Sequence, residues 1–458
     1  MAKNKTIYNC QNCGASHPKW QGQCSQCGEW NTLVEEVVIK EMKGLGARKT
    51  FSKTEVDNKL VSWSQVKSKK SNDQRITTQI EEFDRVLGGE GKTKGIVPGA
   101  VMLLGGEPGI GKSTLLTQVV LKIASQKLSA PIFYVCGEES PQQIDLRINR
   151  ILTKEHKKIS KNNLEFVTTI DVDELVEIIK IKQPSLVVVD SIQAMTTSEL
   201  SGAPGSVGQI RESTDRLADV AKRLSIPMFL VGHVTKDGTI AGPKTLEHIV
   251  DAVLELSGER TGELRLLRTL KNRFGATDEV GVFKVDEVGL AEVSNPSEFL
   301  LENAKTTEPG SATACVMEGT RPLLIEVQAL VVKSQLAMPR RVGRGIDLSR
   351  IQVLSAVLQK HCHQPVDYHD VFLSAAGGYK VTETGIDLAL SMALVSSLKN
   401  KPLPQNSVFI GEVGLLGEIR KVNYLERRIK EAKRLGFKKI YSKETHGSVR
   451  ELLKQIGF

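Results

Sequence analysis

One short segment constrains the fold of this chain more than any other feature. Residues 106–113 read Gly-Glu-Pro-Gly-Ile-Gly-Lys-Ser, a complete match to the phosphate-binding loop GxxxxGKS/T. An apolar run from Val101 to Leu104 precedes the loop, and apolar residues at helical spacing from Leu115 to Ile123 follow it. A strand, a glycine-rich turn and a helix in this order direct backbone N–H groups and the positive end of the helix at a phosphate. The segment therefore predicts a nucleotide-binding α/β core.

The residues of this loop have distinct expected roles in binding ATP with Mg²⁺. The Lys112 ammonium extends toward the β and γ phosphates, and the Ser113 hydroxyl is placed to bind Mg²⁺. A chance glycine turn is the alternative interpretation, but every motif position is filled and both flanking segments agree with the motif. The predicted nucleotide-binding residues are Gly106, Glu107, Pro108, Gly109, Ile110, Gly111, Lys112, Ser113 and Thr114.

Two acidic residues follow apolar runs that are typical of buried strands. Asp190 ends the run 186–189, and Glu138 and Glu139 come shortly after the run 132–135. Because ligands of parallel sheets bind at the carboxyl ends of the strands, these carboxylates are candidates for the site. Asp190 is expected to bind Mg²⁺, and Glu138 is expected to orient and polarise the attacking water. The adjacent Glu139 points to the other face if the strand continues.

A polar loop follows the next expected strand, residues 227–231, and contains His233 and Lys236. Its position after a strand of the same sheet favours contact with the γ phosphate or with a polymer that passes the site. A purely structural role for the histidine is the alternative. Lys236 is a candidate DNA contact.

Four of the seven cysteines form two CxxC pairs near the start of the chain: Cys10 with Cys13, and Cys24 with Cys27. A glycine follows each pair and relieves the tight turn, so two such turns complete a closed tetrahedral Cys₄ zinc site. Two tryptophans of the same segment, Trp20 and Trp30, are expected to pack over the metal. A redox CxxC is the alternative, but that chemistry needs one pair beside a βαβ pattern.

Composition and charge indicate where the chain acts and what it binds. The formal net charge of +9 has the sign expected of a protein that meets nucleic acid. No 18-residue apolar window occurs and the first residues lack an apolar signal segment, so a cytoplasmic location without a membrane partner is expected. Between Lys40 and Arg75, ten basic and four acidic residues give a net charge of +6. This stretch is interpreted as a solvated linker, with a DNA-contacting arm as the alternative.

A basic pentapeptide, Lys271-Asn-Arg-Phe-Gly275, follows a strand-like run at 264–267. Together with the zinc ribbon, the phosphate loop and the Asp190 strand, in this order, it resembles the RadA (Sms) family of bacterial DNA repair proteins, relatives of the RecA recombinase. The resemblance covers nearly the whole chain. An exposed basic turn is the alternative for the pentapeptide alone.

This resemblance implies several functional properties. Glu138 would be the catalytic glutamate, and Lys271 and Arg273 would act with Lys112 in catalysis by reaching the nucleotide held by a neighbouring subunit. The cofactors would be ATP, Mg²⁺ and Zn²⁺. The partners would be single-stranded and branched DNA, further copies of the chain in a homo-hexamer, and the RecA recombinase. The chain departs from the family by inserting residues 90–95 in a connection that is usually short.

The C-terminal third resembles the proteolytic domain of Lon, through residues 347–358, 382–397 and 410–419. Lon cleaves peptides with a serine that a lysine activates, and the resemblance places Gly385 at the serine position and Glu426 at the lysine position. Glycine has no nucleophile, so the domain is expected to have kept the fold and lost the protease. Three arginines that cluster in a glycine-containing loop, Arg340, Arg341 and Arg344, are candidate DNA contacts.

These observations predict an α/β protein with a RecA-like phosphate-loop ATPase core. The expected domains are a Cys₄ zinc ribbon in residues 1–35, a basic linker in 36–75, the ATPase core in 76–294 and an α+β Lon-protease-like domain in 295–458. The expected function is a DNA-dependent ATPase, a ring-forming motor for strand exchange and branch migration in recombinational repair. An ATP-switched DNA-binding module without motor activity is the alternative, and an ATP-dependent peptidase is disfavoured because both dyad positions are lost.

Overall fold

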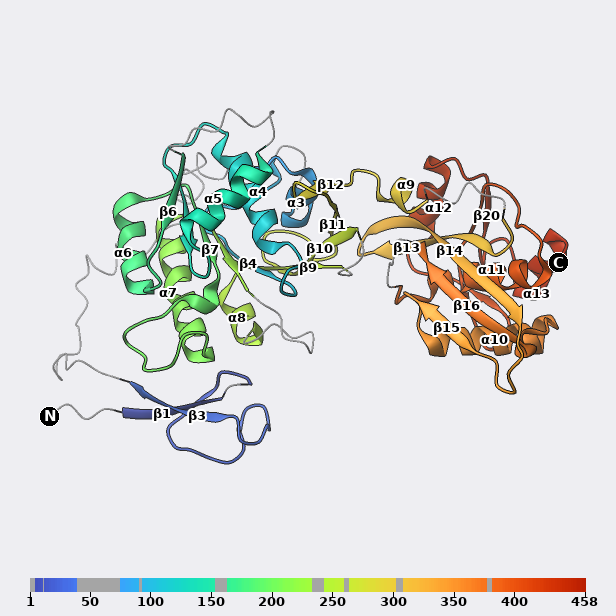
Figure 1. Cartoon of the computed structure of the whole chain (residues 1–458), viewed down its shortest axis with the longest axis horizontal. Coiled ribbons are helices and arrows are strands. Elements are labelled where there is room, and N and C mark those ends of the chain that lie inside the picture. Colours follow the sequence, from blue (N-terminus) through green and yellow to red (C-terminus); the bar gives the residue numbers. More distant parts are fainter. Residues whose placement is uncertain are drawn as a thin grey trace, which may run out of the picture. The chain divides into compact units, whose positions relative to one another are not determined.

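The computed structural model describes residues 5–10, 12–38, 75–89, 93–152, 163–232, 243–258, 263–301, 308–376 and 381–458. The chain divides into two compact units (Figure 1). The first contains residues 1–257, 266–277 and 285–292, and the second contains 258–265, 278–284 and 293–458. Nearly all of the expected linker, the first half of the 90–95 insertion and the loop with His233 and Lys236 lie outside the described residues.

The N-terminal segment forms a small antiparallel sheet in the order β2-β1-β3. Its strands are β1 (Lys5–Cys10), β2 (Ser16–His17) and β3 (Leu33–Val38). Among the side chains that the structure describes there, the apolar cluster consists of Cys10, Cys24 and Leu33 with a few half-buried neighbours. A core of this size cannot hold a fold by apolar burial alone, so a metal cross-link is the expected source of stability.

The ATPase core is built on a nine-stranded sheet in the order β12-β11-β10-β9-β4-β8-β7-β5-β6. The six strands from β9 to β6 pair in parallel, and β10 pairs antiparallel with β9. Parallel strands need crossover helices, and the alternating order of strands and helices along this sequence supplies them. The strands are β4 (Val101–Gly105), β5 (Ile132–Cys136), β6 (Leu164–Val167), β7 (Leu186–Asp190), β8 (Met228–Val231), β9 (Ala252–Ser257), β10 (Leu264–Asn272), β11 (Val280–Val285) and β12 (Leu290–Glu292).

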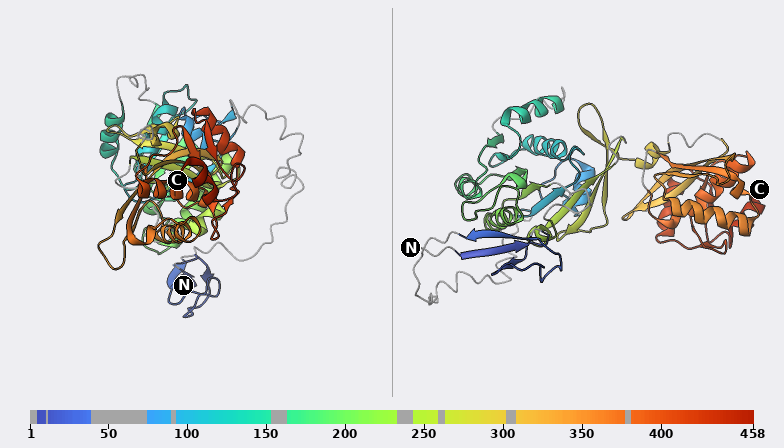
Figure 2. Two further views of the ribbon diagram at one scale, coloured as in Figure 1. Left: turned by 90° about the vertical axis from the view of Figure 1, so that its right-hand side faces the viewer. Right: turned by 60° about the horizontal axis from the view of Figure 1, so that its bottom comes forward.

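The central strands are buried throughout, because helices cover the sheet (Figure 2). Alternate side chains, such as Leu103 and Val135, pack against buried residues of α6 and α7. Helix α5 begins with a capping box, in which Ser140 accepts from the Gln143 backbone N–H. The helices are α3 (Glu81–Leu87), α4 (Lys112–Ala124), α5 (Pro141–Ile151), α6 (Val172–Lys182), α7 (Val207–Leu224) and α8 (Pro243–Ile249).

The second unit is an α+β domain around a six-stranded sheet in the order β15-β16-β14-β13-β17-β20. Helix α11 is buried over nearly its whole length, as expected for a helix that is apolar on all sides. The strands are β13 (Ser311–Glu318), β14 (Arg321–Lys333), β15 (Arg341–Arg344), β16 (His369–Ala375), β17 (Ser407–Phe409) and β20 (Lys439–Tyr441), with a separate pair β18 (Glu412–Val413) and β19 (Ile419–Arg420). The helices are α9 (Pro296–Leu300), α10 (Leu348–Cys362), α11 (Asp387–Lys399), α12 (Leu425–Arg434) and α13 (Val449–Ile456).

Strand β14 runs without a break through an interruption in its apolar pattern. Gln328 and Ala329 interrupt the apolar pattern, yet the strand continues through them. The reason is that Gln328 pairs with Ser311 of β13 on one side and with Ser374 of β16 on the other. Pairing on both sides satisfies the backbone, so a polar side chain does not end the strand.

Candidate functional site

The phosphate loop connects the buried strand β4 to helix α4, and its glycines adopt backbone conformations that other residues avoid. Gly106, Gly109 and Gly111 have φ values of 151°, 80° and 114°. A Cβ at Gly106 would lie 2.4 Å from the Leu256 carbonyl oxygen, so only glycine fits there. Gly111 precedes the first residue of α4, which directs the free N–H groups of the helix start into the loop.

Lys112 is the first residue of α4 and is almost fully buried. Its Nζ donates to the carbonyl oxygens of Gly106, at 2.8 Å, and Glu107, at 3.0 Å. Burial lowers the pKa of this ammonium, and the nearby charges of Asp190 and Glu138 oppose that shift. The lysine is thus held inside the loop, ready to exchange carbonyl oxygens for phosphate oxygens.

Asp190 ends β7, two strands from β4 in the sheet. The Tyr134 hydroxyl donates to its Oδ2 at 2.8 Å, and burial, reinforced by the aspartate, raises the pKa of that tyrosine well above its ordinary value. Tyr134 therefore stays protonated and orients the carboxylate. A carboxylate fixed in this way beside a phosphate loop is an oxygen ligand suited to Mg²⁺.

Glu138 lies just beyond the end of β5, the neighbour of β7. Its backbone N–H and that of Gly137 both donate to the Asp190 carbonyl oxygen, at 3.2 and 2.9 Å. The Ser191 hydroxyl donates to Glu138 Oε1. These contacts hold Glu138 beside the end of the Asp190 strand, and its side chain is exposed to solvent there. A residue that orients an attacking water needs such a position.

Glu139, the alternative to Glu138, has a different partner. It forms an ion pair with Arg147 of α5. Its charge is therefore engaged within the subunit, and Glu138 is the better candidate for the catalytic carboxylate.

These residues fit ATP and Mg²⁺ on their own geometry. The glycine conformations leave no room for side chains at Gly106, the buried ammonium of Lys112 has only carbonyl partners, and Asp190 and Glu138 are close enough to act on its pKa. Backbone N–H groups and Lys112 would hold the phosphates, and Ser113 with Asp190 would hold Mg²⁺. The ion would supply neutralising charge at the β and γ phosphates.

The pentapeptide 271–275 lies at the opposite edge of the sheet from the phosphate loop. Arg273 N–H donates to the Asp251 carbonyl oxygen, and Asp251 N–H donates to that of Val101, which is the first residue of β4. Since a strand rises about 3.3 Å per residue, the length of β4 alone places Arg273 about 13 Å from Gly105, where the loop begins. Arg273 therefore lies too far from the loop to reach a nucleotide bound there. Lys271 lies nearer along the sheet, because it pairs with Val253, the neighbour of Leu103, but its ammonium is directed at backbone carbonyl oxygens.

Both cations have partners at this edge. Arg273 Nη1 lies 3.0 Å from Asp251 Oδ1, with half of the arginine side chain exposed. Lys271 Nζ donates to the carbonyl oxygens of Glu247 and Val250. Burial, followed by the charge of Arg273, lowers the pKa of Lys271.

The other residues of the pentapeptide fix its shape. Asn272 Nδ2 donates to the Leu87 carbonyl oxygen at 3.1 Å, and a Cβ at Gly275 would lie 3.0 Å from the Gly88 Cα. Arg75 donates to the carbonyl oxygens of Gly88, at 2.9 Å, and Phe274, at 2.6 Å. Arg75, which the sequence places in the linker, is thus a structural residue of the core. The pentapeptide is a built feature rather than a free surface turn.

The four N-terminal cysteines converge as predicted. Their Sγ atoms all lie within 4.8 Å of one another, and the pairs Cys10 with Cys27 and Cys13 with Cys24 are 3.6 Å apart. Zinc–sulfur bonds of 2.3 Å in a tetrahedron give sulfur separations of about 3.8 Å, so the residues fit a Cys₄ zinc site. Each CxxC turn closes at its glycine, where the N–H of Gly14 and that of Gly28 donate to a cysteine carbonyl oxygen at 2.8 Å.

Two side chains that the sequence pattern does not reveal contact the sulfurs. Thr32 Oγ1 lies 3.2 Å from Cys10 Sγ, and His17 Nε2 lies 3.4 Å from Cys24 Sγ. Groups of this kind orient metal ligands and tune their charge. The expectation that Trp20 and Trp30 pack over the metal is wrong, because both side chains are mostly exposed.

Three families match the chain in the order of these parts. Residues 8–35 match a rubredoxin metal binding domain, residues 57–239 an AAA domain, and residues 334–444 the subunit ChlI of Mg-chelatase. DNA repair protein RadA of Pseudomonas aeruginosa is 47% identical over 439 residues, which cover 96% of this chain and 93% of that protein. DNA repair protein RadA of Bacillus subtilis is 45% identical over 441 residues, with the same coverage.

The chain belongs to the RadA family of DNA repair proteins. The predicted resemblance and fold class are thereby confirmed, and the phosphate loop is that of an ATPase domain. Among solved structures, a KaiC-like protein from Pyrococcus horikoshii is similar at 20% identity and a TM-score of 0.38, over 48% of this chain and 99% of that chain. Within the described parts of the chain, none of the helices has the length and apolar character needed to cross a bilayer.

In this RadA-family chain, the position of the expected protease dyad holds an ion pair. A Cβ at Gly385 would lie 3.0 Å from Arg428 Nη1 and 3.4 Å from Glu383 Oε1. Arg428 is fully buried, and its two terminal nitrogens bind both Glu383 oxygens at 2.8 and 2.7 Å. The resemblance places Glu426 at the lysine position, but Glu426 is exposed, and Arg428, two residues further along α12, is the residue beside Gly385.

The three candidate DNA-contacting arginines lie on or beside an edge strand. The expected loop is instead strand β15, which pairs with β16 on one side only. Arg340 and Arg344 are exposed, whereas Arg341 donates to the carbonyl oxygens of His369 and Val366. Arg340 and Arg344 thus remain available to a phosphate backbone, and Arg341 serves the fold.

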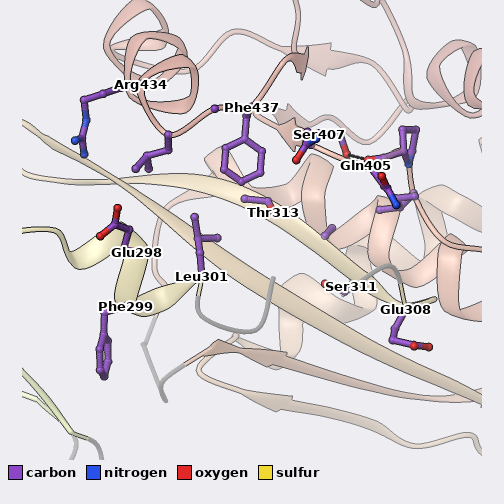
Figure 3. Close-up of a pocket in the computed structure, with 16 residues that line it drawn as sticks. Glu298, Phe299, Leu301, Glu308, Ser311, Thr313, Gln405, Ser407, Arg434 and Phe437 are labelled. Atoms are coloured by element: carbon purple, nitrogen blue, oxygen red, sulfur yellow. Dashed lines mark hydrogen bonds between the residues drawn. The ribbon is translucent and has the colours of Figure 1, made fainter. Parts of the chain in front are cut away.

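The second unit also contains a cavity of about 890 Å³, bordered by α9, β13, β17 and the turn after α12 (Figure 3). Figure 3 shows Arg434 and Phe437 on one side and Glu298 and Leu301 on another. Arg434 is already paired with Glu431 at 2.7 Å. None of the predicted site residues lines this cavity, so it has no part in the site described above.

Proposed function

We propose that this chain is a DNA-dependent ATPase that assembles into a ring, a hexamer, on single-stranded DNA and promotes strand exchange and branch migration in recombinational repair. RecA recombinase is its proposed partner. The observation that carries the proposal is the position of Lys271 and Arg273. Arg273 lies at the ends of the strands away from its own phosphate loop, and the Lys271 ammonium is directed away from that loop, which supports a role for both on the nucleotide of a neighbouring subunit.

In this mechanism each subunit supplies one half of the site. Lys112 and the loop N–H groups hold the phosphates, and Glu138, oriented by Ser191, polarises the attacking water. Arg273 of the adjacent subunit then neutralises charge that develops on the γ phosphoryl group. Asp251 already holds the Arg273 side chain in position in the free subunit, so assembly does not have to order it. Hydrolysis is thereby coupled to assembly.

The C-terminal unit is proposed to be a scaffold without protease activity. Gly385 offers no nucleophile, and the guanidinium of Arg428 has N–H donors and no acceptor, so it cannot act as a base. The exposed Arg340 and Arg344 are its proposed contacts with the DNA backbone.

A first experiment measures ATP hydrolysis with and without single-stranded DNA. DNA is expected to raise the rate of the native protein, and Lys112→Ala and Lys271→Ala are expected to abolish the rise. Arg223→Ala is the matched control, because this arginine is 74% exposed and pairs only with Asp219 of its own helix. A rate that DNA leaves unchanged contradicts the motor and favours the ATP-switched binding module.

A mixing experiment tests the shared site directly. Lys112→Ala subunits cannot hold nucleotide, and Arg273→Ala subunits cannot supply the trans cation. In an equal mixture, about a quarter of the interfaces combine an intact loop with an intact Arg273, so about a quarter of the native activity should return. No recovery in a mixture that still forms rings would show that both residues serve the same subunit.

A further inference from the structure

Two aromatic side chains of the zinc ribbon lie mostly in solvent. Trp20 is 58% exposed and Trp30 is 67% exposed, and neither belongs to the buried cluster around the cysteines. A tryptophan buries 150–250 Å² when it is used for packing, so leaving two of them in water has a cost that calls for a ligand.

The two indoles both lie close to one glycine. A Cβ at Gly22 would lie 3.5 Å from Cζ3 of Trp30 and 4.0 Å from Cη2 of Trp20. The two rings are therefore neighbours on the surface of the ribbon.

The backbone beneath the rings is held by the metal-binding turn. Gln23 and Trp30 form an antiparallel bridge, and the Asn31 N–H donates to the Gly22 carbonyl oxygen at 2.7 Å. The same hairpin contains the turn from Cys24 to Cys27 that binds zinc. Rings on a hairpin closed by a metal lose little freedom when they bind a ligand, which favours stacking.

We propose that Trp20 and Trp30 form a stacking platform for the unpaired bases of single-stranded DNA. Every base has a π face, and aromatic side chains on a positively charged protein bind single strands without regard to sequence. Beside the rings the charges balance, since Lys19 is exposed next to Trp20 and Glu29 next to Trp30, but the chain that follows the ribbon has a net charge of +6 between residues 40 and 75. This charge favours a polyanion over an acidic or neutral protein partner. The inference rests on the proposed function in one respect, that DNA is the partner of the chain.

Intrinsic fluorescence provides the test, because the chain has three tryptophans. A Trp63→Phe variant of the full-length zinc-bound protein leaves Trp20 and Trp30 as the only indole fluorophores. Titration with an oligo-dT strand should quench their emission in a saturable way, whereas a duplex of the same length should not, because its bases are already stacked. Equal quenching by the duplex overturns the platform.

Binding of a labelled oligo-dT strand by the full-length protein gives the second measurement. Trp20→Ala and Trp30→Ala should each weaken binding by about 10-fold, since each base stack contributes on this scale. Val34→Ala, which removes an exposed apolar side chain from the same ribbon, should have no effect. Zinc content is measured in every variant to show that the ribbon is intact.

The two proposals fail in different ways. If the labelled strand binds and stimulates ATP hydrolysis, but the indoles are not quenched and both alanine variants bind normally, the platform is refuted and the proposed function stands. In that case the rings serve another partner, such as a protein. If the chain does not bind the strand at all, both proposals fail.

Discussion

Replacing Glu383 by glutamine should strongly destabilise the second unit, because it leaves a buried arginine without its counter-charge. Arg428 is 2% exposed, and Glu383, the acidic residue with which it forms an ion pair, is 26% exposed. Removing one partner of a buried pair costs about 3–5 kcal/mol. Solvent reaches Glu383, and the carbonyl oxygens of Cys315 and Asn423 still accept from Arg428, so the lower end, about 3 kcal/mol, applies.

Hydrogen exchange on the full-length protein measures this effect within one unit. A loss of about 3 kcal/mol corresponds to exchange about 100-fold faster for the protected amides of β13 and α11. The amides of α4, in the other unit, serve as the internal reference and should not change. Glu412→Gln is the matched control, because its pair with Arg420 is exposed and contributes less than about 1 kcal/mol.

A double variant sharpens the test. Glu383→Gln combined with Arg428→Met removes both charges, and it should be more stable than Glu383→Gln alone, since no uncompensated charge remains buried. Exchange in Glu383→Gln no faster than in the Glu412→Gln control would refute the reasoning that this pair anchors α12 against β13.

Three further predictions concern the ATP site, pH and zinc. Ser191→Ala should lower kcat for ATP hydrolysis by about 10-fold and leave KM unchanged, because it frees the Glu138 carboxylate without touching the phosphates; a change in KM alone would contradict this. Burial raises the pKa of Asp387 to about 7, although Arg350 opposes the shift. The folded state thus binds this proton more tightly than the unfolded state. The free energy of unfolding should therefore fall as pH rises from about 4 to 7 and then level off. Hydrogen exchange of Asp387→Asn should lack this dependence on pH. Zinc removal by a chelator should abolish protection of the β1 and β3 amides and leave α4 unchanged; persistent protection would show that the ribbon does not need the metal.

The parts that sequence predicted best are those whose chemistry lies within one continuous segment. The phosphate loop carries its glycines, Lys112 and Ser113 in eight residues, and the adjacent strand and helix follow from local apolar patterns. Two CxxC turns likewise determine the zinc ligands, because each turn by itself aims two sulfurs at one point.

Prediction was weaker where it depended on which side of a helix a residue lies on, or on how far a side chain is exposed to solvent. Glu426 and Arg428 differ by two residues, which on a helix is about 200°, so a small alignment error exchanges a buried residue for an exposed one. Exposure of Trp20 and Trp30 is also invisible in the sequence, because it depends on what the folded ribbon places over them. Ser191 is a different case: it directly follows Asp190 in the sequence and could have been singled out for that reason.

By itself the sequence was enough to predict a nucleotide-phosphate site and a Cys₄ zinc site, and to place the chain with the RadA proteins. Only the tertiary structure decided where the pentapeptide lies. The position of Arg273 depends on the pairing of β10 with β9 and of β9 with β4, which joins residues far apart in the chain. Strand register is determined by such distant contacts rather than by local propensity, so no local pattern could show that Arg273 lies at the edge away from its own phosphate loop.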